Sequence, residues 1–252
     1  MKIVVSLKVV SDDQDVQVMS DGSLDFSKAH HVVSAYDLNA MEAAALLAAT
    51  TEGSSIVGMT AGSAAINDSK LKKNILARGI DELYMTADDA CADMDAHATA
   101  EALTALVAKI GEFDLILCGD GSADNYAQQV DVQLAAKLGL PVVGGVTKIT
   151  AQGDHLEIER TLEDVVETVL VPLPAVVAVS PDIALPRIPG MKDILAAGKK
   201  PMEVSAAGRS FVNTLEMLDC KAPKQADRKL EIIEASEDGA IAKFAAALKA
   251  AL

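Results

Sequence analysis

Two glycines and several hydrogen-bonding side chains follow a short apolar run in the stretch CGDGSADNYAQQV. Gly119 and Gly121 would let a phosphate approach the backbone N–H groups of a turn, and a helix from about Tyr126 would present its positive end to that phosphate. Gln128 and Gln129 could hydrogen-bond a ribose or a phosphate. The spacing matches neither a dinucleotide fingerprint nor a Walker motif, so a phosphate-binding turn and an ordinary strand–helix turn both stay open.

Metal binding and catalysis have weaker support in the residue pattern. Asp120 and Asp124 could hold a divalent cation beside a phosphate, although Asp124 could equally cap the following helix, which is the commoner role. His30 and His31 have no further ligand at metal spacing and are interpreted as surface residues. Cys118 ends an apolar run and is expected in the core. We predict no metal site and no catalytic residue.

Charge and composition exclude several classes of function. The 252 residues carry a formal net charge of −15, which disfavours binding to nucleic acid or to an anionic membrane. The three cysteines are widely spaced and predict neither a disulfide framework nor a zinc site. The N-terminus lacks an export signal, and no apolar run reaches the ~20 residues of a membrane span. We therefore expect a cytoplasmic protein.

Short β-branched runs alternate with longer runs of helical spacing. The predicted strands are Lys2–Val10, Ser54–Thr60, Glu82–Thr86, Asp114–Gly119 and Pro174–Ser180, and the predicted helices are Tyr36–Ala49, Ser69–Arg78, Ala96–Ile110 and Tyr126–Leu138. Strands joined by helices imply right-handed crossovers and a parallel sheet. We predict an α/β fold, Rossmann-like, with a mainly parallel sheet and helices on both faces.

Ligands of such sheets bind beyond the carboxyl ends of the strands. Thr60–Ser63 and Gly119–Ser122 are loops of this kind and should meet at one edge, which predicts a nucleotide site. The alternation in Val142–Thr168 around a Gly-Asp pair predicts an antiparallel hairpin. Residues 1–204 are then one nucleotide-binding domain. Residues 205–252, ending in a helix over Asp238–Leu252, are too few for a core and predict an extended arm.

The segment ALPRIPGMKDILAAGKKPME, residues 184–203, resembles the signature segment of the β subunits of electron transfer flavoproteins. The matching positions are Pro186, Arg187, Ile194, Leu195, Ala197, Lys199, Lys200, Pro201 and Glu203. The stretches SAYDLNAMEAA, MTAGSAA and LILCGDGSADNYAQQV agree in order as well, so the resemblance covers nearly the whole chain. YDLNA, YAQQV and IERTLED resemble most the Fix-type β subunits linked to carnitine or related acyl-CoA metabolism.

The resemblance implies a heterodimer in which this chain binds AMP or FAD and its arm wraps an α subunit that holds the redox-active FAD. The nucleotide pocket would be lined by Ser6, Ser34, Ala35, Tyr36, Asp37, Ala61, Gly119, Asp124, Gln128, Gln129 and Val130. A threonine and a glycine of the family's phosphate loop are absent here, and Asp131 adds negative charge. AMP and FAD therefore both stay open, and with FAD so does electron bifurcation.

The resemblance also accounts for Met191, because the family uses an exposed apolar side chain here to anchor a partner of the acyl-CoA dehydrogenase type. Lys192 and Arg187 would orient that encounter. A buried methionine capping the short helix that follows is the alternative. For the whole chain, the alternative is a stand-alone adenine-nucleotide-binding homodimer similar to stress proteins, which would leave the docking segment without a role.

Overall fold

The computed structural model describes residues 1–224 and 230–251. The chain divides into two compact units: Met1–Gln17 with Asp25–Asp219, and Val18–Leu24 with Cys220–Leu252. The sequence-based boundary lay after residue 204, whereas the larger unit continues to Asp219. Residues 225–229 and 252 of the expected arm lie outside the described residues.

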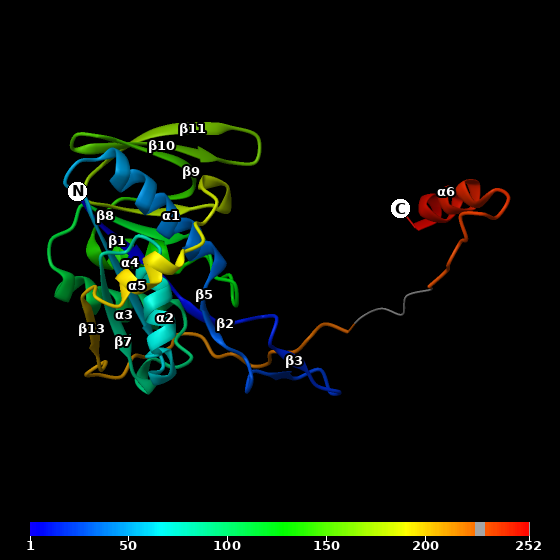
Figure 1. Cartoon of the computed structure of the whole chain (residues 1–252), viewed down its shortest axis with the longest axis horizontal. Helices are drawn as coiled ribbons and strands as arrows, with labels where there is room; N and C mark the ends of the chain where they lie inside the picture. Colours follow the sequence, from blue (N-terminus) through cyan, green and yellow to red (C-terminus); the bar gives the residue numbers. More distant parts are fainter. Residues whose placement is uncertain (225–229, 252) are drawn as a thin grey trace. The chain divides into compact units, whose positions relative to one another are not determined.

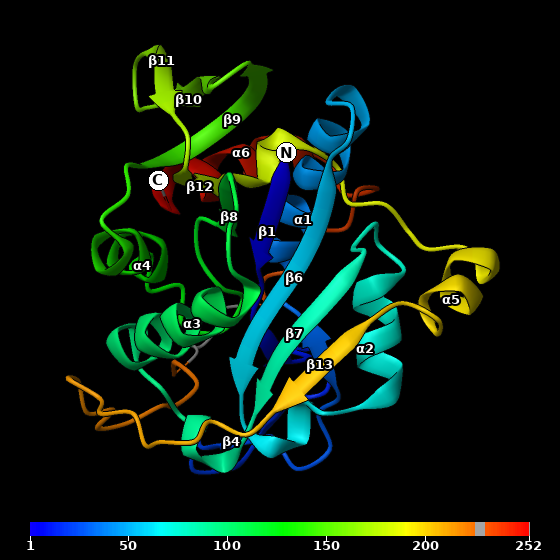
Figure 2. The same ribbon diagram turned by 90° about the vertical axis from the view of Figure 1, so that its left-hand side faces the viewer.

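The larger unit is built on a nine-stranded sheet in the order β11-β10-β9-β12-β8-β1-β6-β7-β13 (Figures 1 and 2). These strands are β1 (Lys2–Ser6), β6 (Ser55–Gly62), β7 (Glu82–Ala87), β8 (Leu115–Gly119), β9 (Val142–Gln152), β10 (His155–Thr161), β11 (Val166–Pro172), β12 (Ala175–Val179) and β13 (Met202–Ser205). β1 pairs in parallel with β6 on one side and with β8 on the other. The predicted α/β class with a mainly parallel sheet is confirmed.

Helices cover both faces of the sheet, as Figure 2 shows. They are α1 (Ala35–Thr50), α2 (Ser69–Leu76), α3 (Ala96–Ile110), α4 (Val130–Leu138) and the short α5 (Met191–Ala197), with single 3₁₀ turns η1 (Ala64–Ile66), η2 (Asp89–Cys91) and η3 (Pro181–Ile183). Side chains alternate along β1: Ile3 and Val5 pack in the cluster that includes α1 and α2, whereas Val4 packs with α3 and α4. A strand buried on both faces explains the continuous apolar run in the sequence.

The predicted antiparallel hairpin is present at one side of the sheet. β9 runs parallel to β12 and then pairs antiparallel with β10 through a turn at Gly153, whose φ of 67° suits glycine. β11 pairs antiparallel with β10 and extends the hairpin to three strands.

Two predicted elements have different bounds. The predicted strand Lys2–Val10 is split, because β2 (Val9–Ser11) leaves the main sheet to pair with β5 (His31–Val33). The predicted helix from Tyr126 begins instead at Val130. Tyr126 and Gln128 have φ values of 45° and 55°, which belong to the left-handed region and interrupt a right-handed helix.

The smaller unit contains little regular structure. Ser23 and Lys221 form an antiparallel bridge, and the N–H of Ala222 donates to the carbonyl of Gly22 at 2.9 Å. The short strands β3 (Gln17–Val18) and β4 (Leu24–Asp25) flank its first segment in the sequence, and α6 (Ala240–Ala251) is its one helix among the described residues. No helix in the described part of the chain is long and apolar enough to cross a membrane.

Candidate functional site

The carboxyl ends of β1 and β8 form the topological switch point of the sheet. From β1 the strand order continues to β6 and β7 on one side and to β8 and β12 on the other. Ligands of open α/β sheets bind in the crevice at such a point. Ser6 ends β1, Gly119 ends β8, and Ala61 lies near the end of β6. The topology therefore brings the predicted loops to one edge.

Asp37, in the first turn of α1, ties the two central strands together. Its carboxylate accepts the N–H of Lys8, which follows β1, at 2.7 Å and the N–H of Gly119 at 3.2 Å. Asp37 is buried, and burial raises the pKa of its carboxyl to about 7 against the two hydrogen bonds and nearby Lys8, which lower it. Asp37 therefore holds together the two strand ends that border the crevice, and its carboxyl group titrates near neutral pH.

Ser34 precedes α1 and fixes the loop that follows β8. Its hydroxyl, which is fully buried, accepts the N–H of Ala123 at 3.2 Å, and it does not cap α1. Ser6 hydrogen-bonds the thiol of Cys118, a group whose pKa is raised by burial. Cys118 is a core residue, as expected, and not a nucleophile.

A salt bridge between Lys8 and Asp124 spans the crevice. The Nζ of Lys8 lies 2.6 Å from Oδ2 of Asp124, and the hydroxyl of Ser122 donates to Oδ1 of the same carboxylate at 2.5 Å. Burial alone would raise the pKa of Asp124, but the hydrogen bonds from Lys8 and Ser122 lower it. Asp124 does not cap α4, because that helix begins six residues later.

Sequence reasoning did not select Lys8 as a site residue. It stands just beyond the end of a central strand, and a cation in that position of a parallel sheet is a signal that could have identified it. Through Asp124, Lys8 brings an ammonium group to the acidic loop after β8.

The residues expected in the first turn of the helix lie outside it. Gln128 precedes α4, Gln129 is its N-terminal cap position without a side-chain cap, and Val130 is its first residue. The Nε2 of Gln128 donates to the hydroxyl of Tyr126 at 3.3 Å. Gln128 and Gln129 are exposed and remain available to a ligand.

Tyr126 lies against Tyr36, the second residue of α1. Their ring centroids are 5.0 Å apart with an angle of 39° between the planes. An aromatic pair offers a flat surface on which a nucleobase could stack. Two further residues near the start of α1 contact this region: Ser34 binds Ala123 of the loop after β8, and Asp37 binds Gly119 at the end of β8. Ala35, the first residue of α1, stands between Ser34 and Tyr36 in the chain.

The two glycines accommodate protein groups rather than leaving open space. A Cβ at position 119 would lie 2.8 Å from Oδ1 of Asp37 and from the backbone carbon of Tyr36. A Cβ at position 121 would lie 2.2 Å from the ring of Tyr126. The absence of a side chain at these two positions thus makes room for the start of α1 and for an aromatic ring.

Two further carboxyl groups at this edge respond to burial. Burial raises the pKa of both Asp120 and Asp131. Oδ1 of Asp120 and the hydroxyl of Thr60 in β6 are buried without a hydrogen-bond partner among the described residues. Buried polar atoms without a partner are rare in proteins and are compatible with a polar ligand at this edge.

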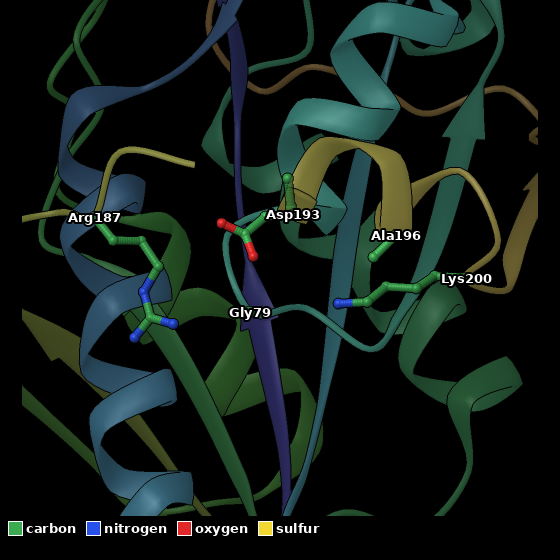
Figure 3. A pocket seen from close by; sticks show the side chains of 6 residues that line it. Gly79, Arg187, Asp193, Ala196 and Lys200 are labelled. Atoms are coloured by element: carbon green, nitrogen blue, oxygen red, sulfur yellow. The ribbon is translucent and has the colours of Figure 1, made fainter. Parts of the chain in front are cut away.

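Two cavities of the larger unit lie away from this edge. One, of about 170 Å³, is bounded by Ala77, Gly79, Arg187, Asp193, Ala196 and Lys200 (Figure 3). The other, of about 530 Å³, is lined by residues at the amino ends of β1 and β8, including Lys2 and Asp114. Neither cavity is lined by a predicted nucleotide residue. No group of three or more metal-ligating side chains occurs in the described part of the chain.

The predicted docking residues lie on a projecting segment, residues 181–200. Met191 is the first residue of α5, and its side chain is 73% exposed, which excludes the alternative of a buried methionine. Lys192 is exposed next to it. Leu185, Ile188 and Leu195 are also strongly exposed. The guanidinium of Arg187, in contrast, is engaged within the chain by Glu42 of α1.

Comparison with known families agrees with this arrangement. A family model described as the electron transfer flavoprotein domain matches residues 22–209, which covers most of the chain and includes the start of α1, the loop after β8 and the projecting segment. The chain therefore belongs to the electron transfer flavoprotein family.

Proposed function

We propose that this chain is the β subunit of a heterodimeric electron transfer flavoprotein. It binds AMP or FAD in the crevice at the carboxyl ends of β1 and β8, and its α partner holds the redox-active FAD. The convergence of the α1 start, Lys8 and the loop after β8 on the switch point carries this proposal. Resemblance to the Fix-type β subunits supports a role in carnitine or related acyl-CoA metabolism.

The chain supplies binding and orientation, while the flavin supplies the electron chemistry. Lys8 can turn from Asp124 to a phosphate, and the exposed Gln128 and Gln129 can donate to ribose or phosphate oxygens. Asp37 keeps the two strand ends at a fixed separation through its backbone hydrogen bonds. None of these groups needs to act as a nucleophile or as a proton donor.

The projecting segment is the proposed contact with an acyl-CoA dehydrogenase-type flavoenzyme. Met191 presents an unbranched thioether that fills an irregular apolar pocket, and its exposure leaves it free to do so. Lys192 is placed beside it to pair with an acidic group of the partner and to orient the encounter. Arg187 contributes by attaching the segment to α1 through its ion pair with Glu42.

The nucleotides released from the complex test the proposed function and distinguish a conventional carrier from a bifurcating one. The chain is co-expressed with its α partner, the purified complex is denatured, and the nucleotides are quantified by chromatography. One FAD and one AMP per heterodimer indicate a conventional carrier with a structural nucleotide in this chain. Two FAD and no AMP place a second flavin here and make bifurcation the hypothesis to pursue. A nucleotide-free chain that forms a homodimer and retains no α partner would overturn the proposal.

A further inference from the structure

Helix α1 contacts both the crevice and the projecting segment. Its first turn holds Tyr36 and Asp37 at the crevice. Farther along the same helix, Asn39 and Glu42 are buried and bind residues of the segment. One helix therefore contacts both the crevice and the projecting segment.

Glu42 holds Arg187 through three hydrogen bonds. The Nε of Arg187 donates to Oε2 at 2.6 Å, its Nη2 donates to Oε1 at 2.9 Å, and its backbone N–H donates to Oε2 at 3.1 Å. The guanidinium of Arg78 donates to the backbone carbonyl of Arg187 at 2.6 Å. Side chain and backbone of Arg187 are both fixed, which a single-point surface ion pair would not achieve.

Asn39 fixes the beginning of the segment. Its Nδ2 donates to the carbonyls of Pro181, at 3.2 Å, and Ala184, at 2.8 Å. One carbonyl belongs to the first residue of η3 and the other to the residue that follows η3, so one amide group holds the turn at the start of the segment. At the other end, the Nζ of Lys200 donates to the carbonyls of Leu76 and Ile80 at 3.0 and 2.6 Å.

Apolar packing contributes little to the position of α5. Ala197 is its one buried residue, and the remaining residues of the helix are exposed. The cavity of about 170 Å³ next to α5 is bordered by Arg187, Asp193 and Lys200, which Figure 3 shows around Gly79. A seven-residue helix with one buried side chain is not held by hydrophobic burial. The polar contacts of Arg187, which precedes the helix, and of Lys200, which follows it, hold the helix instead.

We propose that Glu42 is a positioning residue for partner recognition: it fixes Arg187 to α1 and so presents Met191 in the orientation that the partner binds. This inference rests on the proposed docking function of the segment. Fixing an exposed anchor before the encounter lowers the conformational entropy lost on binding. Lysine could not replace Arg187, because it lacks the planar fork that satisfies both carboxylate oxygens.

A double-mutant cycle tests the proposal in the FAD-loaded heterodimer. An acyl-CoA dehydrogenase of the source organism, reduced by its acyl-CoA substrate, serves as the electron donor. Glu42→Gln should raise the KM for the dehydrogenase about tenfold, as expected for loss of a buried charge-assisted contact, with kcat within about twofold. Glu101→Gln is the control, because it removes an ion pair with Lys137 between α3 and α4, on the opposite face of the sheet from α1, and should leave the KM unchanged.

The cycle separates positioning from a merely structural effect. If Glu42 acts through Met191, the effect of Glu42→Gln should almost disappear in a Met191→Ala background. Equal effects in both backgrounds would overturn the role of Glu42 and leave the docking function standing. A Met191→Ala variant with unchanged KM would overturn the docking function, and the present proposal with it.

Proteolysis provides a measurement on the heterodimer that needs no dehydrogenase. Trypsin should cleave the heterodimer after Lys192 and Lys199 faster in Glu42→Gln than in the original protein, because the segment loses its contact with α1. Arg187→Lys keeps a charge opposite Glu42, and a faster cut in this variant supports the proposal even if Glu42→Gln folds poorly. Unchanged cleavage rates in both variants would show that Glu42 does not hold the segment.

Discussion

At Gly119, the end of β8 comes into direct contact with the start of α1. The residue's N–H donates to Asp37, and the missing side chain makes room for the backbone of Tyr36. Asp37 receives a second N–H from Lys8, so a single carboxylate joins the two strand ends that border the crevice. The crevice therefore depends on the size of one residue and the charge of another.

Gly119→Ala should destabilise the protein by about 1–3 kcal/mol, the range for forcing an extra methyl into a packed site. The new Cβ would lie 2.8 Å from backbone and carboxylate atoms that cannot rotate away. Nucleotide content should fall as well, because the start of α1 must shift. Gly144→Ala is the control, since a Cβ there meets nothing within 4 Å. Urea midpoints and released nucleotide measure both effects, and equal behaviour of the two variants would contradict this account.

Asp37 predicts a pH dependence of stability. Its pKa is raised by burial from 3.8 to about 7, so between these values the folded protein keeps a proton that the unfolded chain has lost. Stability from this group is complete below about pH 4 and falls as the pH rises toward 7. Asp37→Asn should flatten this part of the profile, although it lowers stability overall by leaving one N–H facing an amide. Urea unfolding at pH 5 and pH 8 measures the slope, with Asp13→Asn, at an exposed site, expected to retain the original slope.

Sequence reasoning selected residues near the crevice but not the contacts they make. Strand order was enough to place Ser6, Ala61 and Gly119 at one edge, because parallel strands end together. The pairing of Glu42 with Arg187 joins residues 145 positions apart, and no local pattern indicates it. Sequence spacing also could not show that Gly121 faces the ring of Tyr126.

Helix starts illustrate the same limit at the scale of elements. The run after Gly119 has helix-forming residues, so the prediction began the helix at Tyr126, but left-handed backbone at Tyr126 and Gln128 delays it to Val130. The cause is tertiary, since Tyr126 packs on Tyr36. The strands β6, β7, β8 and β12 and the helices α1 and α3 lie close to their predicted bounds, because each follows a clear apolar pattern in the sequence.

Helix α3 binds the chain that follows β13 through its N-terminal cap. Asp95 accepts the N–H of Ala98 within α3 and the N–H groups of Thr214 and Leu215 from that following chain. Burial opposes ionisation, but these hydrogen bonds outweigh it and lower the pKa of Asp95 to about 2. Its stabilising contribution is present above the usual pKa of 3.8 and is lost as the pH falls through about 2.

Asp95→Ala should release residues 213–215 in addition to removing the cap. We expect a loss of about 2–3 kcal/mol and faster tryptic cleavage after Arg209. Asp68→Ala is the matched control, because Asp68 caps α2 through the N–H of Leu71 in the same manner, at 2.7 Å. That variant should lose about 1 kcal/mol without a change at Arg209. Equal cleavage rates would show that Asp95 is a cap and nothing more.

At the scale of the whole molecule, the described residues of the smaller unit bury little apolar surface of their own. Helix α6 has one buried residue, Ala240. Its apolar residues Ile241, Phe244 and Leu248 are exposed and follow helical spacing. A twelve-residue helix is marginal in water without tertiary packing. The apolar stripe of α6, Ile241, Phe244 and Leu248, therefore needs a partner surface, and we propose that of the α subunit.

Phe244→Asp should weaken the heterodimer at least tenfold, because it puts a charge at the centre of that stripe. Ala246→Asp introduces the same charge on the opposite side of the helix and should leave assembly unchanged. Co-purification of the α subunit and the FAD content of the complex, measured by size-exclusion chromatography at several protein concentrations, distinguish the two variants. If Ala246→Asp weakened the complex as much as Phe244→Asp, the effect would come from added negative charge on a chain that already carries −15. If neither variant changed assembly, α6 would not be part of the interface, and the arm would have to bind through other residues.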